Sequence, residues 1–132
     1  MSFLIDTDTC SAHIKGHVLV FNRFAQYAGR LYLSIVTLAE LTIWTCRAAA
    51  PPQRSRDLQD LLKLALPLDA TVDVARKFGE IQAGLLDVGR PAPEMDLLIA
   101  ATALVHGHTV VTHNIQDYAM IPGLTVVDWM VP

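Results

Sequence analysis

The segment Phe3-Leu4-Ile5-Asp6-Thr7-Asp8 places a short apolar run directly before two carboxylates, close to the start of the chain. Such a run is typical of a strand that is buried on both faces, as in a parallel sheet. In an open parallel sheet, ligands bind in the crevice beyond the carboxyl ends of the strands. The segment therefore predicts an α/β fold with a polar site at one edge of its sheet.

Three more acidic residues take the same kind of position. Glu40 follows the apolar run 31–36, Asp117 follows the run 110–112, and Asp96 lies at the start of an apolar helix pattern. Carboxylates gathered in one crevice repel each other and would have to take up protons or a cation. Hard oxygen ligands suit Mg²⁺ or Mn²⁺. The pattern indicates a metal-dependent enzyme that acts on a phosphate ester.

Strands and helices are expected to alternate along the chain, which indicates parallel βαβ units. Strands are expected at residues 2–6, 31–36, 66–68, 109–112 and 125–127. Helices are expected at residues 12–28, 37–50, 57–66, 70–87 and 94–106. Gly107 is expected to cap the last helix, and Asp57 is expected at an N-cap. The chain has no internal repeat and no linker, so we expect one domain over residues 1–132.

Each acidic residue also has a purely structural interpretation. Asp6 could cap the turn that follows its strand, and Asp117 could be a solvated loop residue. The segment Thr37-Leu38-Ala39-Glu40 fits a capping box, in which the glutamate reaches back to the N-cap amide. Asp96 is favoured in a first helical turn by the helix dipole. Its neighbours are core-like apolar residues, however, and a partly buried carboxylate needs a partner.

Composition limits the class of protein. Hydrophobic residues make up 52% of the 132 residues, which argues against disorder, and no apolar run approaches the ~18 residues of a membrane span. The start of the chain lacks the features of a signal peptide. Cys10 and Cys46 lie in apolar surroundings without metal-ligand spacing and are expected to be buried thiols. We therefore expect a soluble, cytoplasmic protein without membrane association.

The net charge of −3 excludes a basic nucleic-acid binder of the usual kind. All basic residues nevertheless lie at or before Arg90, and Arg47, Arg54 and Arg56 surround Pro51-Pro52. These three arginines form either a solvated loop or a phosphate-contacting edge beside the acidic crevice, where they would contact the phosphates of a nucleic acid.

Aromatic, imidazole and leucine side chains give weaker signals. Trp44 and Trp129 are expected in the core or in an interface, since the sequence pairs neither with a basic residue as a stacking platform. Among the histidines, only His113 is placed near the acidic crevice. The expected helix 57–66 contains more leucines than one short helix needs to pack against its own core, which predicts an interaction surface. They are Leu58, Leu61, Leu62, Leu64 and Leu66.

The ordered set of motifs resembles the PIN-domain ribonucleases, and most closely the VapC toxins of bacterial toxin–antitoxin pairs. The motifs are LIDTDTCS at 4–11, SIVTLAEL at 34–41, GRP at 89–91 with MDLLIAA at 95–101, VTHNIQDY at 111–118, and IPGL at 121–124 with VDW at 127–129. Each motif alone is weak. Together they follow the family order over nearly the whole chain, and that order is specific.

The resemblance implies a three-layer α/β/α fold with a central, mostly parallel sheet. It carries the family's catalytic and metal-binding quartet onto Asp6, Glu40, Asp96 and Asp117. It also places Thr112 and Asn114 among the polar residues that line the same pocket. Asp8 departs from the family pattern, which usually has asparagine there. The extra negative charge would tighten metal binding or change the number of metal ions.

The function that this resemblance implies is that of the toxin of a type II toxin–antitoxin system. Such a toxin is a Mg²⁺- or Mn²⁺-dependent endoribonuclease that hydrolyses RNA phosphodiester bonds, often in a structured target such as tRNA. A small cognate antitoxin silences it, and we expect a homodimer or a higher complex with that antitoxin.

Two other functions remain open at the level of sequence. Asp6-Thr7-Asp8 after a strand also resembles the haloacid-dehalogenase phosphatases, in which Asp6 would be the nucleophile and Asp8 the acid/base. That motif requires Thr or Val where this chain has Cys10, and a late lysine, whereas no lysine follows Lys77. The other alternative is a PIN-like module that binds RNA or protein without catalysis. Metal-dependent RNA cleavage would distinguish the ribonuclease from both.

Overall fold

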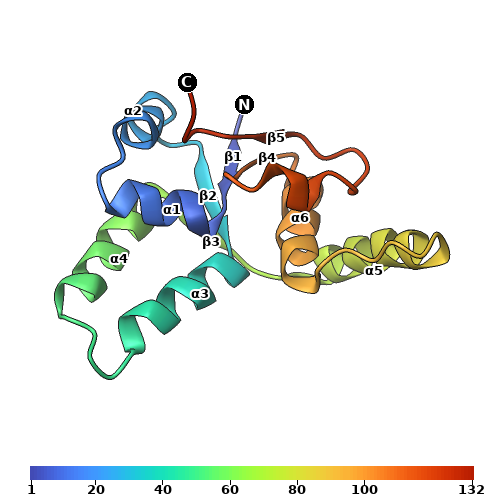
Figure 1. The fold of residues 1–132 in the computed structure, drawn as a ribbon, viewed down its shortest axis with the longest axis horizontal. Helices are drawn as coiled ribbons and strands as arrows, with labels where there is room; N and C mark the ends of the chain where they lie inside the picture. The colour runs from blue at the N-terminus through green and yellow to red at the C-terminus, as the bar shows by residue number, and fades with distance from the viewer.

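The computed structural model describes residues 1–132 and contains a parallel sheet between two layers of helices (Figure 1). The strands are β1 (Phe3–Ile5), β2 (Leu31–Ser34), β3 (Leu66–Leu68), β4 (Thr109–Val111) and β5 (Val126–Val127). Their order in the sheet is β3-β2-β1-β4-β5, and all neighbouring pairs are parallel. The predicted α/β fold with a central parallel sheet is confirmed. Because the strand order reverses between β1 and β4, the crevice for a ligand lies at the carboxyl ends of these two strands.

The helices cover both faces of the sheet. They are α1 (Thr7–Ile14), α2 (Val18–Gln26), α3 (Ile35–Cys46), α4 (Gln53–Leu64), α5 (Val72–Asp87) and α6 (Glu94–His106), with a short 3-10 helix, η1 (Ile115–Tyr118). In Figure 1, α1, α2 and α4 lie on one side of the strands, and α5 and α6 lie on the other. None of these helices combines the length and the apolar character that a membrane span requires.

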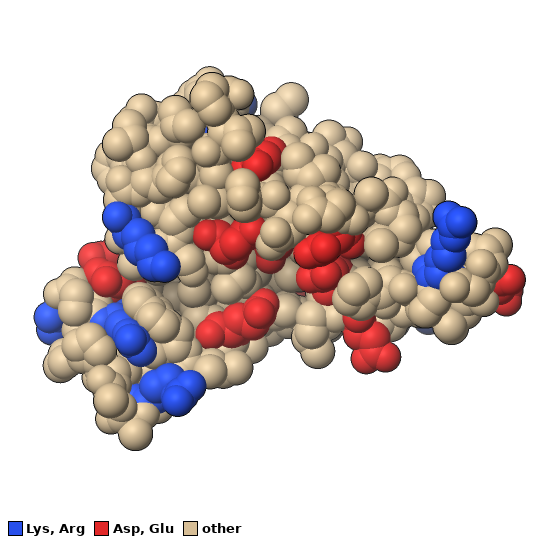
Figure 2. Space-filling model, in the orientation of Figure 1, with Lys and Arg blue, Asp and Glu red and all other residues tan.

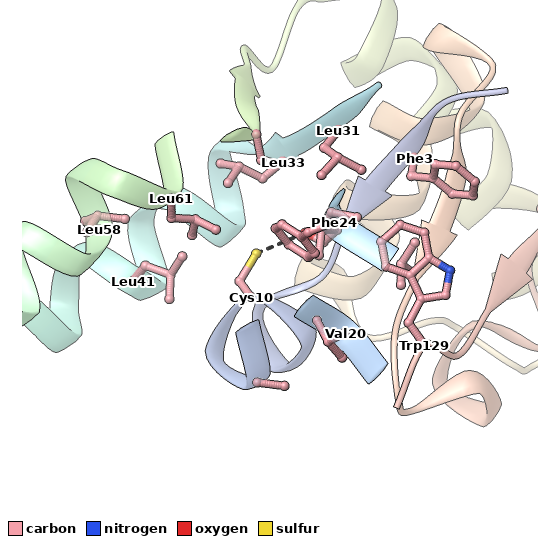
Figure 3. Close-up of a cluster of buried hydrophobic side chains, with 14 residues drawn as sticks. Phe3, Cys10, Val20, Phe24, Leu31, Leu33, Leu41, Leu58, Leu61 and Trp129 are labelled. Atoms are coloured by element: carbon pink, nitrogen blue, oxygen red, sulfur yellow. Dashed lines mark hydrogen bonds between the residues drawn. The ribbon is translucent and has the colours of Figure 1, made fainter. Parts of the chain in front are cut away.

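Side chains alternate across the sheet, so each strand contributes to two separate cores. Phe3 and Ile5 belong to the first core, with α1, α2 and α4, whereas Leu4 belongs to the second, with α5 and α6. Figure 3 shows Phe3, Phe24 and Trp129 side by side in the first core, and the ring centroids of Phe3 and Trp129 are 4.9 Å apart. Helices on both faces explain why β1 is an uninterrupted apolar run in the sequence.

The single helix predicted over residues 12–28 is wrong. The structure has two helices, α1 and α2, with a corner at Gly16, whose φ of +80° favours glycine over residues with a Cβ. Helix α1 begins at Thr7, directly after β1, and the Asp6 side chain caps it by accepting a 2.7 Å hydrogen bond from the Thr7 amide. The first carboxylate of the chain is therefore fixed where the first strand passes into a helix.

The structural alternative for Glu40, a capping box with Thr37 at the N-cap, is not observed. Helix α3 begins two residues earlier, at Ile35, and its N-cap is Ser34, whose hydroxyl accepts a 3.2 Å hydrogen bond from the Thr37 amide. Glu40 therefore lies in the second turn, where the backbone does not require its carboxylate. The helix ends at Cys46, before the position 50 that the sequence predicted.

Helix α4 differs from the prediction at its start and in its buried face. It begins at Gln53, so Asp57 lies within the helix and accepts a 2.8 Å hydrogen bond from Gln53 Nε2 instead of capping it. Leu58 and Leu61 were expected to contribute to an exposed interaction surface, but they are buried in the first core. Of that leucine set, Leu64 and Leu66 are the exposed members, at 45% and 57%.

Other local predictions had mixed outcomes. The edge strand at 66–68 and the helix at 94–106 are confirmed, and Gly107 caps that helix with a left-handed φ of 71°. Cys10 is buried, as expected, but Cys46 is exposed at the end of α3. Neither cysteine forms a disulfide.

Candidate active site

Asp6 lies at the centre of the acidic crevice, at the carboxyl end of β1. Its Oδ2 accepts hydrogen bonds from the Thr112 hydroxyl at 2.9 Å and from the Tyr118 hydroxyl at 3.0 Å. The side chain is buried, and burial raises the pKa of this carboxyl, although the Thr7 amide opposes the shift. Three donors from three segments therefore hold one carboxylate in a fixed orientation.

Asp8 connects α1 to the loop that follows β4. Its Oδ2 accepts hydrogen bonds from the His113 amide at 3.0 Å, from Asn114 Nδ2 at 3.2 Å and from the Thr112 hydroxyl at 3.3 Å. Its Oδ1 accepts from the Thr9 hydroxyl at 3.1 Å. Protein donors thus already surround both oxygens of Asp8, so its first role in this structure is to hold the loop after β4.

Glu40 reaches the same site from α3. Its Oε1 accepts a 2.9 Å hydrogen bond from the hydroxyl of Thr7, the first residue of α1. The Thr7 hydroxyl is also 3.2 Å from the hydroxyl of Thr37, one turn before Glu40. Thr7 is therefore the bridge that orients Glu40 toward the end of β1.

Asp96 and Asp117 come from α6 and η1. Burial raises the pKa of the Asp96 carboxyl, and Asp6, Asp117, Glu40 and Asp8 raise it further through their negative charges, in that order. Asp117 is placed by η1, in which its amide donates a 3.0 Å hydrogen bond to the Asn114 carbonyl. Asp96 thus interacts electrostatically with the other four members of the acidic cluster.

No protein cation neutralises this cluster. The ion pairs of the structure join Lys63 to Asp60, Lys77 to Glu80 and His113 to Asp128, and all three lie outside the five carboxylates. Figure 2 shows acidic side chains around a hollow at the middle of one face, while basic side chains gather toward the lower left of the view. The crevice therefore carries an uncompensated negative charge.

The structure brings together every acidic residue that the sequence singled out, and also Thr112 and Asn114. Sequence reasoning missed Thr7 and Tyr118, which orient Glu40 and Asp6. Both lie inside the motifs that the sequence displays, at residues 4–11 and 111–118. Their polar hydroxyls beside acidic residues were the signal that could have identified them.

The three arginines that are candidates for nucleic-acid binding do not all line the same pocket. Arg47 and Arg54 line a pocket that also contains Glu40, whereas Arg56 donates a 2.8 Å hydrogen bond to Gln53 on the exposed surface of α4. The expectation that Trp44 has no basic partner is wrong. Arg54 lies over the Trp44 ring, with its Cζ 5.2 Å from the ring centroid.

Comparisons with known proteins identify the family of the chain. The family model of the PIN domain matches residues 3–119. The tRNA(fMet)-specific endonuclease VapC of Salmonella typhimurium strain LT2 is 31% identical over 132 residues, and the alignment covers 98% of each chain. The chain belongs to the VapC group of the PIN-domain family. Ribonuclease VapC2 of Haemophilus influenzae strain Rd is 29% identical to this PIN domain over 131 residues, covering 98% of this chain and 99% of the other.

Solved structures give the same result for the fold. The PIN domain superimposes on a chain of DNA-bound VapBC from Salmonella typhimurium with a TM-score of 0.90, 31% identity and 98% coverage of each chain. A chain of VapBC2 from Rickettsia felis, bound to a promoter DNA fragment, gives a TM-score of 0.88, 26% identity and coverage of 98% and 99%. The family resemblance carried by the motifs is confirmed.

The PIN domain is a metal-dependent nuclease fold, and the residues of this chain fit a hydrated divalent cation. All five acidic side chains offer oxygen, the ligand that hard cations prefer. No three acidic, histidine or cysteine side chains lie close enough to hold one ion by themselves. Mg²⁺ dehydrates reluctantly and binds through one or two carboxylates while it keeps several waters, so a wide cluster of carboxylates suits it.

Proposed function

We propose that this PIN domain, residues 1–132, is the toxin of a type II toxin–antitoxin system and acts as a metal-dependent endoribonuclease. The observation that carries the proposal is the group of five carboxylates around the carboxyl end of β1, with no protein cation among them. Like charges kept this close need an external cation or protons. The similar proteins named ribonuclease VapC support the choice of RNA as the substrate.

The cation that we propose is Mg²⁺ or Mn²⁺, which Asp6, Asp96, Asp117 and Glu40 would hold in part through coordinated water molecules, because no three of these side chains lie close enough to hold it alone. When bound, such an ion polarises a phosphoryl oxygen and lowers the pKa of a coordinated water. The chain itself keeps the carboxylates in place: Tyr118 and Thr112 orient Asp6, and Thr7 orients Glu40.

The substrate that we propose is a structured RNA such as a tRNA. The relative from Salmonella typhimurium carries tRNA(fMet) specificity in its name and shares 31% of its residues with this chain. A net charge of −3 gives little long-range attraction to RNA, so recognition must depend on local contacts beside the crevice.

A small antitoxin is the partner that we propose, in a complex that contains two or more copies of the PIN domain. Two similar solved structures are VapBC complexes bound to DNA. The uncompensated negative charge of the crevice suits an arginine from such a partner, which would exclude RNA from the site. We place the protein in the cytoplasm, where RNA is available and both of its free thiols stay reduced.

The toxin proposal is tested by expression in a bacterial host. The wild-type chain should stop growth, whereas Asp96→Asn, expressed to the same level, should not. Asp60→Asn, on the exposed face of α4, is the matched control and should remain toxic. Co-expression of the small gene next to the natural gene should restore growth. Equal toxicity of wild type and Asp96→Asn would contradict the enzymatic proposal, and toxicity that the adjacent gene does not relieve would contradict the antitoxin partnership.

The alternatives give different results in the same cells. A PIN-like module without catalysis would leave RNA intact, so sequencing of the 5′ ends of cellular RNA distinguishes it from a ribonuclease. New ends at one position of one or a few RNAs are expected. The chain matches the PIN-domain family over residues 3–119, which argues against Asp6 and Asp8 as the nucleophile and the acid/base of a haloacid-dehalogenase phosphatase.

A further inference from the structure

A pocket of about 550 Å³ lies between α3 and the start of α4, next to the acidic crevice. Ile43 and Trp44 give it an apolar wall, Arg47 and Arg54 give it positive charge, and Glu40 is shared with the acidic cluster. The pocket is therefore continuous with the site at which we propose that RNA is cleaved.

The two arginines of this pocket have no anionic partner. Arg54 donates a 3.0 Å hydrogen bond to the carbonyl oxygen of Trp44 and lies over the ring of the same residue, so neutral groups alone hold it in place. Arg47, at the C-cap of α3, is exposed and belongs to none of the ion pairs. The pocket thus presents two positive charges, and one of them is already fixed against an aromatic ring.

This combination matches the chemistry of a nucleotide. Unpaired bases stack on aromatic rings and on arginine guanidinium groups, and arginine binds phosphate in a planar, two-pronged geometry. Glu40 repels a phosphate, so the phosphate belongs at the arginine end of the pocket and away from the acidic cluster. An apolar wall between the two ends is left for the base or the ribose.

We propose that this pocket binds a nucleotide of single-stranded RNA that flanks the scissile phosphate. The inference rests on the proposed ribonuclease function, because it takes the acidic crevice as the place where the strand is cut. An RNA strand that crosses the crevice at Glu40 must leave it along one of its sides. The side formed by α3 and α4 supplies the positive charge that the crevice itself lacks.

Binding of a fluorescently labelled single-stranded RNA tests the pocket independently of cleavage. In EDTA, Arg47→Gln, Arg54→Gln and Trp44→Leu should each weaken binding by roughly 5-fold or more, the lower end of a stacking contribution. Each lost phosphate contact should also reduce the slope of log K against log salt by about 0.7. Arg23→Gln is the matched control, because it removes one positive charge from the exposed surface of α2, outside the pocket, and its RNA binding should match wild type.

Two further measurements separate the possible outcomes. In a cleavage assay, Arg47→Gln should raise KM and leave kcat close to wild type. Because Arg47 is exposed, this variant should fold normally, and loss of folding would not explain a higher KM. If all three pocket variants bind RNA as tightly as Arg23→Gln while wild type cleaves RNA, the pocket inference is overturned and the proposed function stands. If wild type cleaves no RNA, the proposed function is overturned, together with the role of the pocket in cleavage. Variants that bind RNA normally but lose antitoxin would assign the pocket to the antitoxin and overturn the inference.

Discussion

The Tyr118 hydroxyl donates a 3.0 Å hydrogen bond to Oδ2 of Asp6, and both side chains are buried. Tyr118 ends η1, and Asp6 follows β1 as the N-cap of α1, so this bond ties the loop after β4 to the carboxylate at the centre of the crevice. Burial and the nearby charge of Asp6 raise the pKa of the Tyr118 hydroxyl, which keeps it protonated as a donor.

Replacing Tyr118 with Phe should therefore affect both stability and activity. A hydrogen bond to a charged group contributes about 1.5–3 kcal/mol, and its loss leaves a buried carboxylate with one donor fewer. We expect Tyr118→Phe to lower the free energy of unfolding by an amount of that order in urea titrations, and to reduce RNA cleavage. Tyr27→Phe is the control, because the Tyr27 hydroxyl has no hydrogen bond in the structure, although its ring stacks on Trp129. Equal losses in both variants would show that the bond to Asp6 is unimportant.

Replacing Asp96 with Asn should stabilise the metal-free protein. Burial and the neighbouring acids raise the pKa of Asp96, so its charged form is less favourable in the folded protein than in the unfolded chain at neutral pH. A neutral amide of the same shape removes that penalty. In EDTA at pH 7, we expect a higher melting temperature for Asp96→Asn than for wild type. Asp69→Asn, in an exposed loop, should match wild type, and a lower melting temperature for Asp96→Asn would contradict the electrostatic account.

Binding of a divalent cation should reverse the order of these two melting temperatures. A ligand that binds only the folded state stabilises it by about 2.7 kcal/mol at a hundredfold excess over Kd. Saturating Mg²⁺ or Mn²⁺ should therefore raise the melting temperature of wild type, and raise that of Asp96→Asn much less. Thermal scans with and without the ion measure both shifts. Equal shifts in the two proteins would show that Asp96 takes no part in metal binding.

Asp8 should prove more important for the loop after β4 than for the metal. Its oxygens accept hydrogen bonds from the His113 amide, from Asn114 and from two threonine hydroxyls. Asp8→Ala removes these acceptors, so the His113 amide should exchange with solvent much faster, as hydrogen exchange would measure. The metal-induced rise in melting temperature should be reduced less by Asp8→Ala than by Asp96→Asn. A larger reduction in Asp8→Ala would favour the sequence expectation that the extra charge tightens metal binding.

His13 should make stability depend on pH. Burial lowers its pKa from the usual 6.5, and its ring stacks on Phe24 at 4.0 Å while its Nδ1 is buried without a partner. The unfolded chain therefore takes up a proton more readily, so the contribution of neutral His13 is complete above about pH 6.5 and is lost as the pH falls below it. His13→Phe keeps an aromatic ring and should flatten the loss of stability between pH 7 and pH 5. A His13→Phe protein that keeps the wild-type slope of stability against pH would disprove the assignment.

The sequence predicted the α/β fold because its strands are short apolar runs separated by helical patterns. It also predicted that Asp6, Glu40, Asp96 and Asp117 approach each other, because parallel strands and the helices after them end at one edge. Their catalytic roles remain predictions. The start of α3 was mispredicted because Thr37 and Glu40 satisfy a capping pattern equally well, and only the observed bond between Ser34 and Thr37 decides between the two registers.

Contacts between distant residues account for the rest of what the sequence did not predict. Trp44 and Arg54 are ten positions apart, in two different helices, and only the turn between α3 and α4 brings them together. The break at Gly16 was missed because Ile14, Val18 and Phe21 keep a helical spacing across it. Burial of Leu58 and Leu61 depends on how α4 packs against α1 and α3, which a local pattern does not specify.

The central claim is that the acidic cluster cleaves RNA with the help of a divalent cation. Cleavage of total bacterial tRNA by the purified protein, followed across a titration of Mg²⁺ or Mn²⁺, tests it most directly. Wild type should cleave only in the presence of the ion, and folded Asp6→Asn should show no cleavage above background at any concentration. RNA cleavage by folded Asp6→Asn at the wild-type rate, or by wild type in excess EDTA, would contradict the account.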